Sequence, residues 1–287
     1  MTDRIAILDI GSNSVRYMKA HIQNGHVDSD CKVLCTTRLA SGLDALGALS
    51  ADRMIATAQA VAAFARDAKE QGFPVYAYAT SATRDAVNRQ QFLDLIHTAS
   101  GLSVTVLSGA EEGRLAFSGA CQGGSMLDIG GGSLQVVTAS ASFSFPCGCV
   151  RAKDRIAFDA PQALQAVLTP WLDSVCALPA SLPAPTVGVG GTITSLGALL
   201  AKQTKFDGAS LAPITQPSLA ALLDALYAMG LPALAAHPLL HKRHDVILHG
   251  GVLLAYLMER LHIETVLPCD RDGMEGFAEA VLCGAFA

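Results

Sequence analysis

Two stretches of the chain, ILDIGSNSVRYMKA at residues 7–20 and MLDIGGGSLQVVTA at residues 126–139, are similar to each other. They are offset by 119 residues, and six of the fourteen aligned positions are identical. The identities include three pairs of residues with small or polar side chains: Asp9 and Asp128, Gly11 and Gly130, and Ser14 and Ser133. Two apolar strands that matched by chance would not easily repeat an Asp, a Gly and a Ser in the same register. A duplicated domain is therefore expected.

Each copy has a local pattern that predicts a β-hairpin. An apolar run with an Asp near its end, at 5–10 or 125–129, leads into a few small or polar residues. A second run of strand character follows, at 15–22 or 134–138. The glycine-rich loops of Walker and Rossmann proteins lead into a helix instead, and neither motif occurs here at a strand–helix junction. The pattern argues against a P-loop NTPase and against a nicotinamide enzyme.

Length and composition indicate a folded protein of two domains. The 287 residues are nearly twice the ~150 residues of a usual domain. Hydrophobic residues make up 51% and charged residues 16%, which excludes disorder, coiled coil and a collagen-like chain. The most apolar stretch, residues 218–236, contains Asp224, Gly230 and Pro232, so no membrane span is expected. The N-terminus does not have the pattern of a signal peptide.

Charge and cysteine content narrow the class further. A net charge of −5 and a pI near 5.9 argue against a general nucleic-acid binder, so a polyanionic substrate would need a local site. The eight cysteines are scattered, and Cys147 and Cys149 are too close in sequence for a structural bridge. Reduced thiols and a cytoplasmic location are expected.

Predicted strands and helices alternate along the rest of the chain, which is typical of the α/β class. The predicted strands are 74–79, 104–107, 186–190 and 264–267. The predicted helices are 51–71, 85–99, 111–120, one that follows Thr192 and ends at 200, 245–261 and 274–285. Glycines at 119, 123 and 124 favour a boundary between domains 1–122 and 123–287. The last helix is one that could pack back on the first domain.

The two hairpin loops are candidate phosphate sites. Gly11, Ser12, Asn13 and Ser14 form the first loop, and Gly130, Gly131, Gly132 and Ser133 form the second. Their backbone N–H groups and hydroxyls suit an anion. The alternative is a pair of tight turns in which Gly and Asn serve only to adopt positive φ. Asp9 and Asp128 precede the loops, and carboxylates beside bound phosphate favour a divalent metal, Mg²⁺, between them.

Eight motifs in order resemble those of the Ppx/GppA phosphatases, the exopolyphosphatases and guanosine pentaphosphate phosphatases. They are LDIGSNSVR, YATSATRDAVNRQQFL (78–93), LSGAEEGRLAF (107–117), LDIGGGSLQVV, FPCGCVR (145–151), VGVGGTITSL (187–196), HDVILHGGVLL (244–254) and CDRDGMEG (269–276). The resemblance implies two ribonuclease-H-like domains of the actin/Hsp70/sugar-kinase superfamily, facing each other across a cleft. It also implies Mg²⁺-assisted hydrolysis of a terminal phosphoanhydride.

The resemblance assigns roles to individual residues. It places the catalytic carboxylate at Glu112, the residue that positions metal and water at Asp128, and its partner at Asp9. It places a phosphate-facing arginine at Arg84. A carboxylate in the first turn of a helix is kept ionised by the macrodipole and could take a proton from water.

Each of these roles has a plainer alternative. Glu111 and Glu112 both favour the first turn of a helix in any protein. Arg84 could be a solvated charge at a helix start. Gly190, Gly191 and Thr192 match the family's opposite phosphate loop, but a simple strand–helix turn would look the same.

One departure from the family pattern concerns the metal site. The second-loop motif normally continues to a Glu, and here that position is Gln135. Gln135 can hold a metal-bound water but supplies no negative charge. Strand alternation predicts Leu134 toward the domain core and Gln135 on the side of Ser133, toward the cleft. Near the C-terminus, Asp272 and Met274 replace a Gly and an Arg of the usual motif.

A histidine-rich segment, His237–His249, lies outside these motifs. His237, His241, His244 and His249 occur within thirteen residues, with Lys242 and Arg243 among them. The i, i+4 spacing of His237 and His241 is that of helical metal ligands, but no third ligand is fixed. The alternative is an exposed, weakly basic entry to a helix.

The leading functional hypothesis is a cytoplasmic, Mg²⁺-dependent phosphatase acting on inorganic polyphosphate or guanosine pentaphosphate. The alternative is a protein that binds or senses these molecules with weak turnover, because Gln135 replaces the usual Glu. An ATP-dependent kinase of the same superfamily is a third hypothesis. No nucleic-acid or membrane partner is expected, and the apolar composition is compatible with a homodimer.

Overall fold

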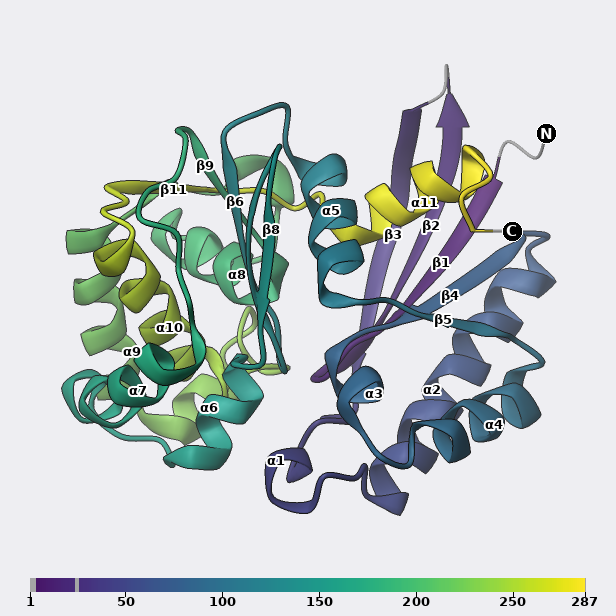
Figure 1. The fold of residues 1–287 in the computed structure, drawn as a ribbon, viewed down its shortest axis with the longest axis horizontal. Coiled ribbons are helices and arrows are strands. Elements are labelled where there is room, and N and C mark those ends of the chain that lie inside the picture. The colour runs from purple at the N-terminus through teal and green to yellow at the C-terminus, as the bar shows by residue number, and fades with distance from the viewer. Residues whose placement is uncertain (1–3, 24–25, 287) are drawn as a thin grey trace. The chain divides into compact units, whose positions relative to one another are not determined.

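The computed structural model describes residues 4–23 and 26–286, and the chain divides into two compact units (Figure 1). Unit 1 comprises residues 1–119 and 273–287, and unit 2 comprises residues 120–272. Each unit contains one mixed β-sheet with helices packed against it. The α/β class expected from the alternating pattern is confirmed.

The sheet of unit 1 has the strand order β3-β2-β1-β4-β5. Its strands are β1 (Arg4–Ile10), β2 (Ser14–Gln23), β3 (His26–Thr36), β4 (Val75–Ala79) and β5 (Val104–Val106). The predicted hairpin is present, because β1 pairs antiparallel with β2. β4 and β5 run parallel to β1. The carboxyl ends of these three strands therefore meet at one edge of the sheet.

Six helices belong to unit 1, in the part of the chain that the structure describes. They are α1 (Leu43–Leu46), α2 (Ala51–Glu70), α3 (Ser81–Asp85), α4 (Arg89–Ser100), α5 (Gly109–Ala120) and α11 (Gly273–Leu282). α2 packs on α4, and α11 lies along β1 and β3 (Figure 1). Met274 and Phe277 of α11 are buried in one core cluster with Ile5, Ile7 and Tyr78. The last helix thus completes the core of the unit that begins the chain.

The sheet of unit 2 repeats this topology. Its strands are β6 (Ser125–Ile129), β7 (Leu134–Thr138), β8 (Ser142–Phe145), β9 (Thr186–Val189), β10 (Ile214–Thr215) and β11 (Thr265–Pro268). The order β8-β7-β6-β9-β11 matches β3-β2-β1-β4-β5 of unit 1, and β10 is added at the edge. The pairing directions also match, antiparallel for β6 with β7 and parallel for β6 with β9 and β9 with β11. The duplicated ribonuclease-H-like fold is confirmed.

The helices of unit 2 surround a large apolar core. They are α6 (Cys149–Arg155), α7 (Pro161–Val175), α8 (Gly190–Leu200), α9 (Gln216–Ala236) and α10 (Ile247–Arg260), with a 3₁₀ turn at Gly208–Ser210. α9 is long and apolar enough to cross a membrane by length and composition alone. Its backbone leaves the helical conformation at Gly230, however, and its buried residues, such as Leu219 and Leu223, pack in the core of unit 2.

One predicted helix begins later than expected. The sequence predicts a helix over 85–99, whereas in the structure the short, unpredicted helix α3 ends at Asp85, Ala86 is extended, and after this interruption α4 begins at Arg89. The Asn88 side chain explains the interruption, because its amide nitrogen donates to Leu49 O at 2.9 Å and its Oδ1 accepts from Leu49 N at 2.9 Å. The interruption leaves α3 as a short helix that carries Arg84.

Candidate functional site

The carboxyl edge of the unit 1 sheet gathers the predicted residues of that unit. β1 leads into the loop Gly11–Ser14, β4 leads into α3, and β5 leads into α5. The first two segments touch directly, since the hydroxyls of Ser12 and Ser81 lie 2.9 Å apart and both residues are buried. Ligands in α/β proteins bind at this end of the strands.

Arg84 and Glu112 are brought together at the same edge. Arg84 Nη1 lies 3.1 Å from Glu112 Oε2 and also donates to the carbonyl of Leu107 at 3.0 Å. Arg84 Nε faces Asp85 Oδ1 at 3.4 Å. The side chains of Arg84 and Glu112 are 23% and 15% exposed, so both keep access to solvent. The predicted phosphate-facing cation and the predicted base form one cluster, which a solvated helix-start charge would not do.

The two adjacent glutamates of α5 have different tasks. Glu111 Oε2 accepts from Ser108 N at 2.8 Å, and Ser108 Oγ accepts from Glu111 N at 3.2 Å. This reciprocal pair is a capping box, and these hydrogen bonds hold the pKa of Glu111 below its usual value. Glu111 therefore serves the start of the helix. Glu112 lies in the same first turn and pairs with Arg84, so its role as the base stays a prediction.

Asp9 is engaged by an arginine on the neighbouring strand. Arg16 lies opposite Asp9 in the β1–β2 pairing, and its Nε donates to Asp9 Oδ2 at 2.7 Å. Arg16 Nη2 contacts the same oxygen, and Asp9 is buried. The guanidinium neutralises the carboxylate inside unit 1. A cation at Asp9 would have to compete with Arg16.

Asp128 of unit 2 occupies the position equivalent to Asp9, but its cross-strand neighbour is Gln135. The flanking residues Ile129 and Leu134 point to the opposite face, where they join the apolar core of unit 2. Leu134 thus lies where the sequence predicted it. Gln135 shares the face of Asp128, and it is only 1% exposed.

Gln135 has one satisfied and one unsatisfied polar atom. Its Nε2 donates to Ser133 Oγ at 3.0 Å. Its Oε1 is buried and accepts no hydrogen bond from the residues that the structure describes. A buried carbonyl oxygen without a donor is costly unless a ligand or an ion completes it.

The glycines of the two loops are not explained by positive φ. Among the described glycines, those in the left-handed region lie elsewhere, which contradicts the alternative that these loops need Gly and Asn for that conformation. Gly11 N donates to Ser14 O at 3.1 Å and Gly130 N to Ser133 O at 3.0 Å. These two amides close the turns themselves, and the other loop residues remain the candidates for phosphate.

The second loop, Gly130–Ser133, which we term the glycine loop, packs closely against Gly148. A Cβ on Gly148 would lie 2.3 Å from the carbonyl carbon of Gly131, so position 148 has no room for a side chain. Cys149 N and Val150 N then donate to Gly130 O and Gly131 O at 2.9 and 2.8 Å. The segment FPCGCVR is thus the support on which the glycine loop rests.

Gly190, Gly191 and Thr192 form the first turn of α8, at the carboxyl end of β9. Gly190 has φ of +82°, and a Cβ there would lie 2.5 Å from Asp128 Oδ1. The residue must therefore be glycine for two independent reasons, its backbone conformation and the closeness of the carboxylate. The N-terminus of a helix presents N–H groups that suit an anion.

Arg243 is a candidate residue that the sequence patterns did not single out. A Cβ on Gly191 would lie 2.1 Å from Arg243 Nη1, so the guanidinium lies against the first turn of α8. Cys149 is buried nearby, and burial raises its pKa to about 11, opposed by the charge of Arg243 and a hydrogen bond with Thr192. An arginine after a stretch of histidines has no distinctive spacing. The close contact at Gly191 could be seen only in three dimensions.

The segment His237–His249 is only partly the exposed entry that was considered. His241 and Lys242 are exposed, but His249 is fully buried in α10 and contacts Ile156 O through Nε2 at 2.9 Å. His237 accepts from a backbone amide, and His241 and His244 contact backbone carbonyls near in sequence. In the described ranges, no group of three His, Cys, Asp or Glu side chains could hold a metal.

Comparison with known proteins assigns the family. The model of the Ppx/GppA phosphatase family matches residues 20–280. The chain belongs to the Ppx/GppA phosphatase family. Exopolyphosphatase 2 of Mycobacterium tuberculosis is 30% identical to this chain over 313 aligned positions, which cover 96% of this chain and 97% of the relative. The resemblance inferred from the eight motifs is confirmed.

Solved structures agree with this Ppx/GppA assignment. A Ppx/GppA enzyme of Aquifex aeolicus aligns with a TM-score of 0.75 at 26% identity, over 96% of this chain and 99% of that one. An exopolyphosphatase of Cytophaga hutchinsonii aligns with a TM-score of 0.87 at 21% identity, over 98% of each chain. At that identity the second likeness concerns the fold alone.

The residues of this Ppx/GppA protein differ in how well they suit Mg²⁺. Asp128 and Gln135 Oε1 offer two oxygens on one face of unit 2, and the unsatisfied Oε1 is what an ion or its water would complete. Mg²⁺ usually takes one or two carboxylates and completes its shell with water and phosphate oxygens. Asp128 with Gln135 fits that requirement. Asp9 also has a buried oxygen, Oδ1, with no hydrogen bond from the described residues, but Arg16 pairs with its Oδ2, so a cation there would compete with the guanidinium.

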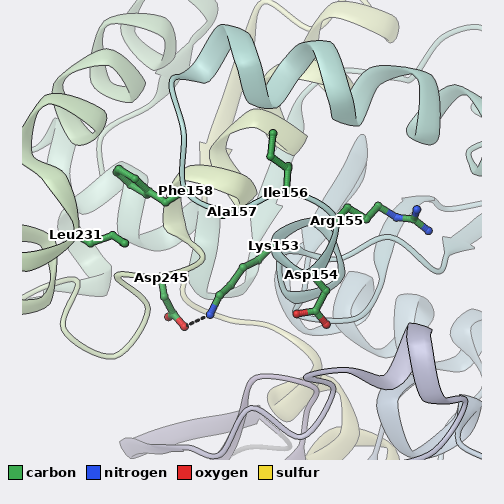
Figure 2. A pocket seen from close by; sticks show the side chains of 8 residues that line it. All are labelled: Lys153, Asp154, Arg155, Ile156, Ala157, Phe158, Leu231 and Asp245. Atoms are coloured by element: carbon green, nitrogen blue, oxygen red, sulfur yellow. Dashed lines mark hydrogen bonds and ion pairs between the residues drawn. The ribbon is translucent and has the colours of Figure 1, made fainter.

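A pocket of about 420 Å³ lies in unit 2 (Figure 2). It is lined by Lys153, Asp154, Arg155, Ile156, Ala157, Phe158, Leu231 and Asp245. Lys153 Nζ and Asp245 Oδ2 form an ion pair of 2.7 Å in its wall. Its two central charges thus neutralise each other, which does not suit a polyanion.

Proposed function

We propose that this chain is a phosphatase that releases terminal orthophosphate from a phosphoanhydride, with inorganic polyphosphate or guanosine pentaphosphate as substrate. The ion pair of Arg84 with Glu112 is the observation that carries the proposal. It sets a carboxylate beside a cation that attracts phosphate oxygens. Membership of the Ppx/GppA family and the similarity to an exopolyphosphatase support the same chemistry.

Each side chain has a defined task in the proposed reaction. Glu112 orients a water molecule and accepts its proton, and Arg84 attracts the phosphate oxygens. Within unit 1, Ser12 offers a hydroxyl to phosphate, and within unit 2 the glycine loop offers backbone amides. Phosphoryl transfer depends mainly on positioning and on charge neutralisation, so these tasks are the ones required.

The proposed reaction uses Mg²⁺, which Asp128 would bind directly and Gln135 would bind through a water molecule. When bound, the ion would neutralise charge on the phosphate oxygens. A cytoplasmic location belongs to the proposal as well, and all eight cysteines are free thiols.

The test is a phosphate-release assay with purified full-length protein. Polyphosphate and guanosine pentaphosphate are supplied in parallel, each with Mg²⁺ and with chelator. Release that requires Mg²⁺ and disappears in Glu112→Gln supports the proposal. Release that is unchanged in Glu112→Gln contradicts the assignment of the base.

A second candidate function is binding or sensing without efficient turnover. Gln135 favours it, because this residue supplies no negative charge where the family pattern has Glu. Calorimetry with short polyphosphate, run beside the release assay, separates the two functions. Tight binding without release supports the sensor, and release at rates usual for a phosphatase rejects it.

A further inference from the structure

Two cysteines of unit 2 face each other in the core. Cys147 Sγ and Cys176 Sγ lie 3.3 Å apart, although the residues are separated by 29 positions in sequence. Cys147 precedes Gly148 in the segment that supports the glycine loop, and Cys176 follows the last turn of α7. Cys147 is fully buried, whereas Cys176 is 8% exposed.

We propose that Cys147 and Cys176 are a redox-active dithiol, which hydrogen peroxide closes into an intramolecular disulfide. A disulfide bond is about 2.0 Å long, so the two sulfurs need to approach by only about 1.3 Å. Neighbouring Cys149 is not the partner, because its side chain lies with Thr192 and Arg243. The geometry therefore makes Cys176 the partner of Cys147.

The two thiols differ in reactivity. The hydrogen bond from Cys147 holds the pKa of Cys176 below its usual value. The same hydrogen bond and burial raise the pKa of Cys147. Cys176 is also the more exposed of the two. It is thus the thiolate that reacts first with an oxidant.

The chemistry balances without any further reactant. The Cys176 thiolate attacks one oxygen of hydrogen peroxide, the O–O bond breaks, and the departing hydroxide takes up a proton as water. Cys176 is then a sulfenic acid. The Cys147 sulfur attacks the Cys176 sulfur, the S–O bond breaks, and the hydroxyl leaves with the Cys147 proton as a second water. Two thiols are oxidised by two electrons, and one peroxide is reduced.

The disulfide would displace the glycine loop. Its effect on phosphate release rests on the proposed function of that loop. Cys147 is bonded to Gly148, which has no room for even a methyl group against Gly131. The amides of Cys149 and Val150 hold the carbonyls of the same loop. Tightly packed backbone transmits displacement, so movement of Cys147 shifts the loop. Oxidation would thereby lower phosphate release.

Mass spectrometry tests the dithiol independently of activity. The full-length protein is titrated with hydrogen peroxide, its remaining thiols are alkylated, and its peptides are sequenced. We expect a peptide pair joined through Cys147 and Cys176, lighter by two hydrogen atoms and separated by dithiothreitol. The exposed Cys35 and Cys283 serve as internal controls. Alkylation of both Cys147 and Cys176, at peroxide concentrations that oxidise the controls, would overturn the proposal.

The release assay tests the effect on the loop. We expect oxidised wild-type protein to release phosphate about ten- to a hundredfold more slowly than reduced protein, as for a misplacement of about 1 Å, and to recover with dithiothreitol. Cys176→Ala should keep its rate in peroxide, while Cys283→Ala should respond like wild type. Equal rates with and without the disulfide would overturn the effect on the loop. If reduced protein releases no phosphate, the proposed function fails, and calorimetric binding of short polyphosphate gives the same comparison.

Discussion

Gln135 lies directly across the β6–β7 pairing from Asp128, in the place that Arg16 has opposite Asp9 in unit 1. The duplicated fold therefore presents one carboxylate neutralised by a guanidinium and one facing a neutral amide. In unit 1 the neutralising charge is part of the chain. In unit 2 the cross-strand neighbour carries no charge, and Mg²⁺ with phosphate is the combination that we propose at this face.

Replacing Gln135 by Glu tests this placement. A second carboxylate beside Asp128 in a buried position should destabilise the metal-free protein, because two like charges are desolvated together. Mg²⁺ should reverse that loss and bind more tightly, by on the order of 1–4 kcal/mol before solvation losses. Melting temperature against Mg²⁺ concentration measures both effects. A Gln135→Glu protein that melts lower and ignores Mg²⁺ would show that no ion binds at this face.

The adjacent glutamates of α5 provide a matched pair of variants. Glu112→Gln should lower the rate of phosphate release by a factor of about 100 to 10,000, the usual contribution of a general base. Glu111→Gln should retain the rate and lose only about 0.3–1 kcal/mol of stability, since Gln keeps the hydrogen bond from Ser108 N but removes the first-turn charge. Rates and urea unfolding are measured on both. Equal loss of rate in the two variants would contradict the division of tasks.

Alanine substitutions at Gly190 and Gly72 distinguish the effect of backbone strain from the effect of a steric contact with Asp128. Both have left-handed φ, +82° and +77°, but nothing lies within 4 Å of a Cβ on Gly72. Alanine at either position should cost about 1–2 kcal/mol in backbone strain. Only Gly190→Ala should also displace the carboxylate of Asp128 and reduce phosphate release. If Gly72→Ala slows release as much, general destabilisation is the cause.

Arg243 should contribute to phosphate binding through the first turn of α8. We expect Arg243→Gln to raise KM for polyphosphate about tenfold or more, as the loss of one charge-assisted hydrogen bond of about 1.5–3 kcal/mol implies. Lys242→Gln, at the exposed neighbouring position, is the control and should leave KM within twofold. The salt dependence of KM provides a second readout. An unchanged KM in Arg243→Gln would remove the residue from the site.

His249 should make the protein less stable in mild acid. Burial lowers its pKa, so the unfolded chain takes up this proton at a higher pH than the folded chain does. The stability is intact above the unfolded value of about 6.5 and declines as the pH falls below it. Urea unfolding between pH 5 and pH 8 measures the decline. His249→Gln keeps a donor for Ile156 O but does not titrate, so its decline should be smaller, whereas exposed His241→Gln should follow wild type.

The sequence predicted what depends on local pattern and on the repeat. The two hairpins, the α/β class and the placement of Leu134 in the core follow from apolar periodicity and from the matching Asp, Gly and Ser residues. The interruption between α3 and α4 depends on hydrogen bonds between Asn88 and Leu49, which is 39 positions away in sequence. The residues near Asn88 therefore do not predict it.

The candidate site shows the same limit. The pairing of Arg84 with Glu112 joins residues 28 positions apart, and the contact of Arg243 with Gly191 joins residues 52 positions apart. Motifs named three of these residues without placing them together. Arg16 escaped notice because an arginine in a strand is ordinary until its partner is known to be a buried carboxylate.

The return of α11 to unit 1 has a consequence for synthesis of the protein. Met274 and Phe277 fill the core that contains Ile5 and Ile7, so β1 cannot complete its packing until α11, synthesised more than 250 residues later, is available. Unit 2 is a continuous segment, residues 120–272, and has all its strands before α11 is made. The nascent chain should therefore complete its second half first. A chain truncated before residue 273 would hold a finished unit 2 beside an N-terminal sheet with its apolar face uncovered.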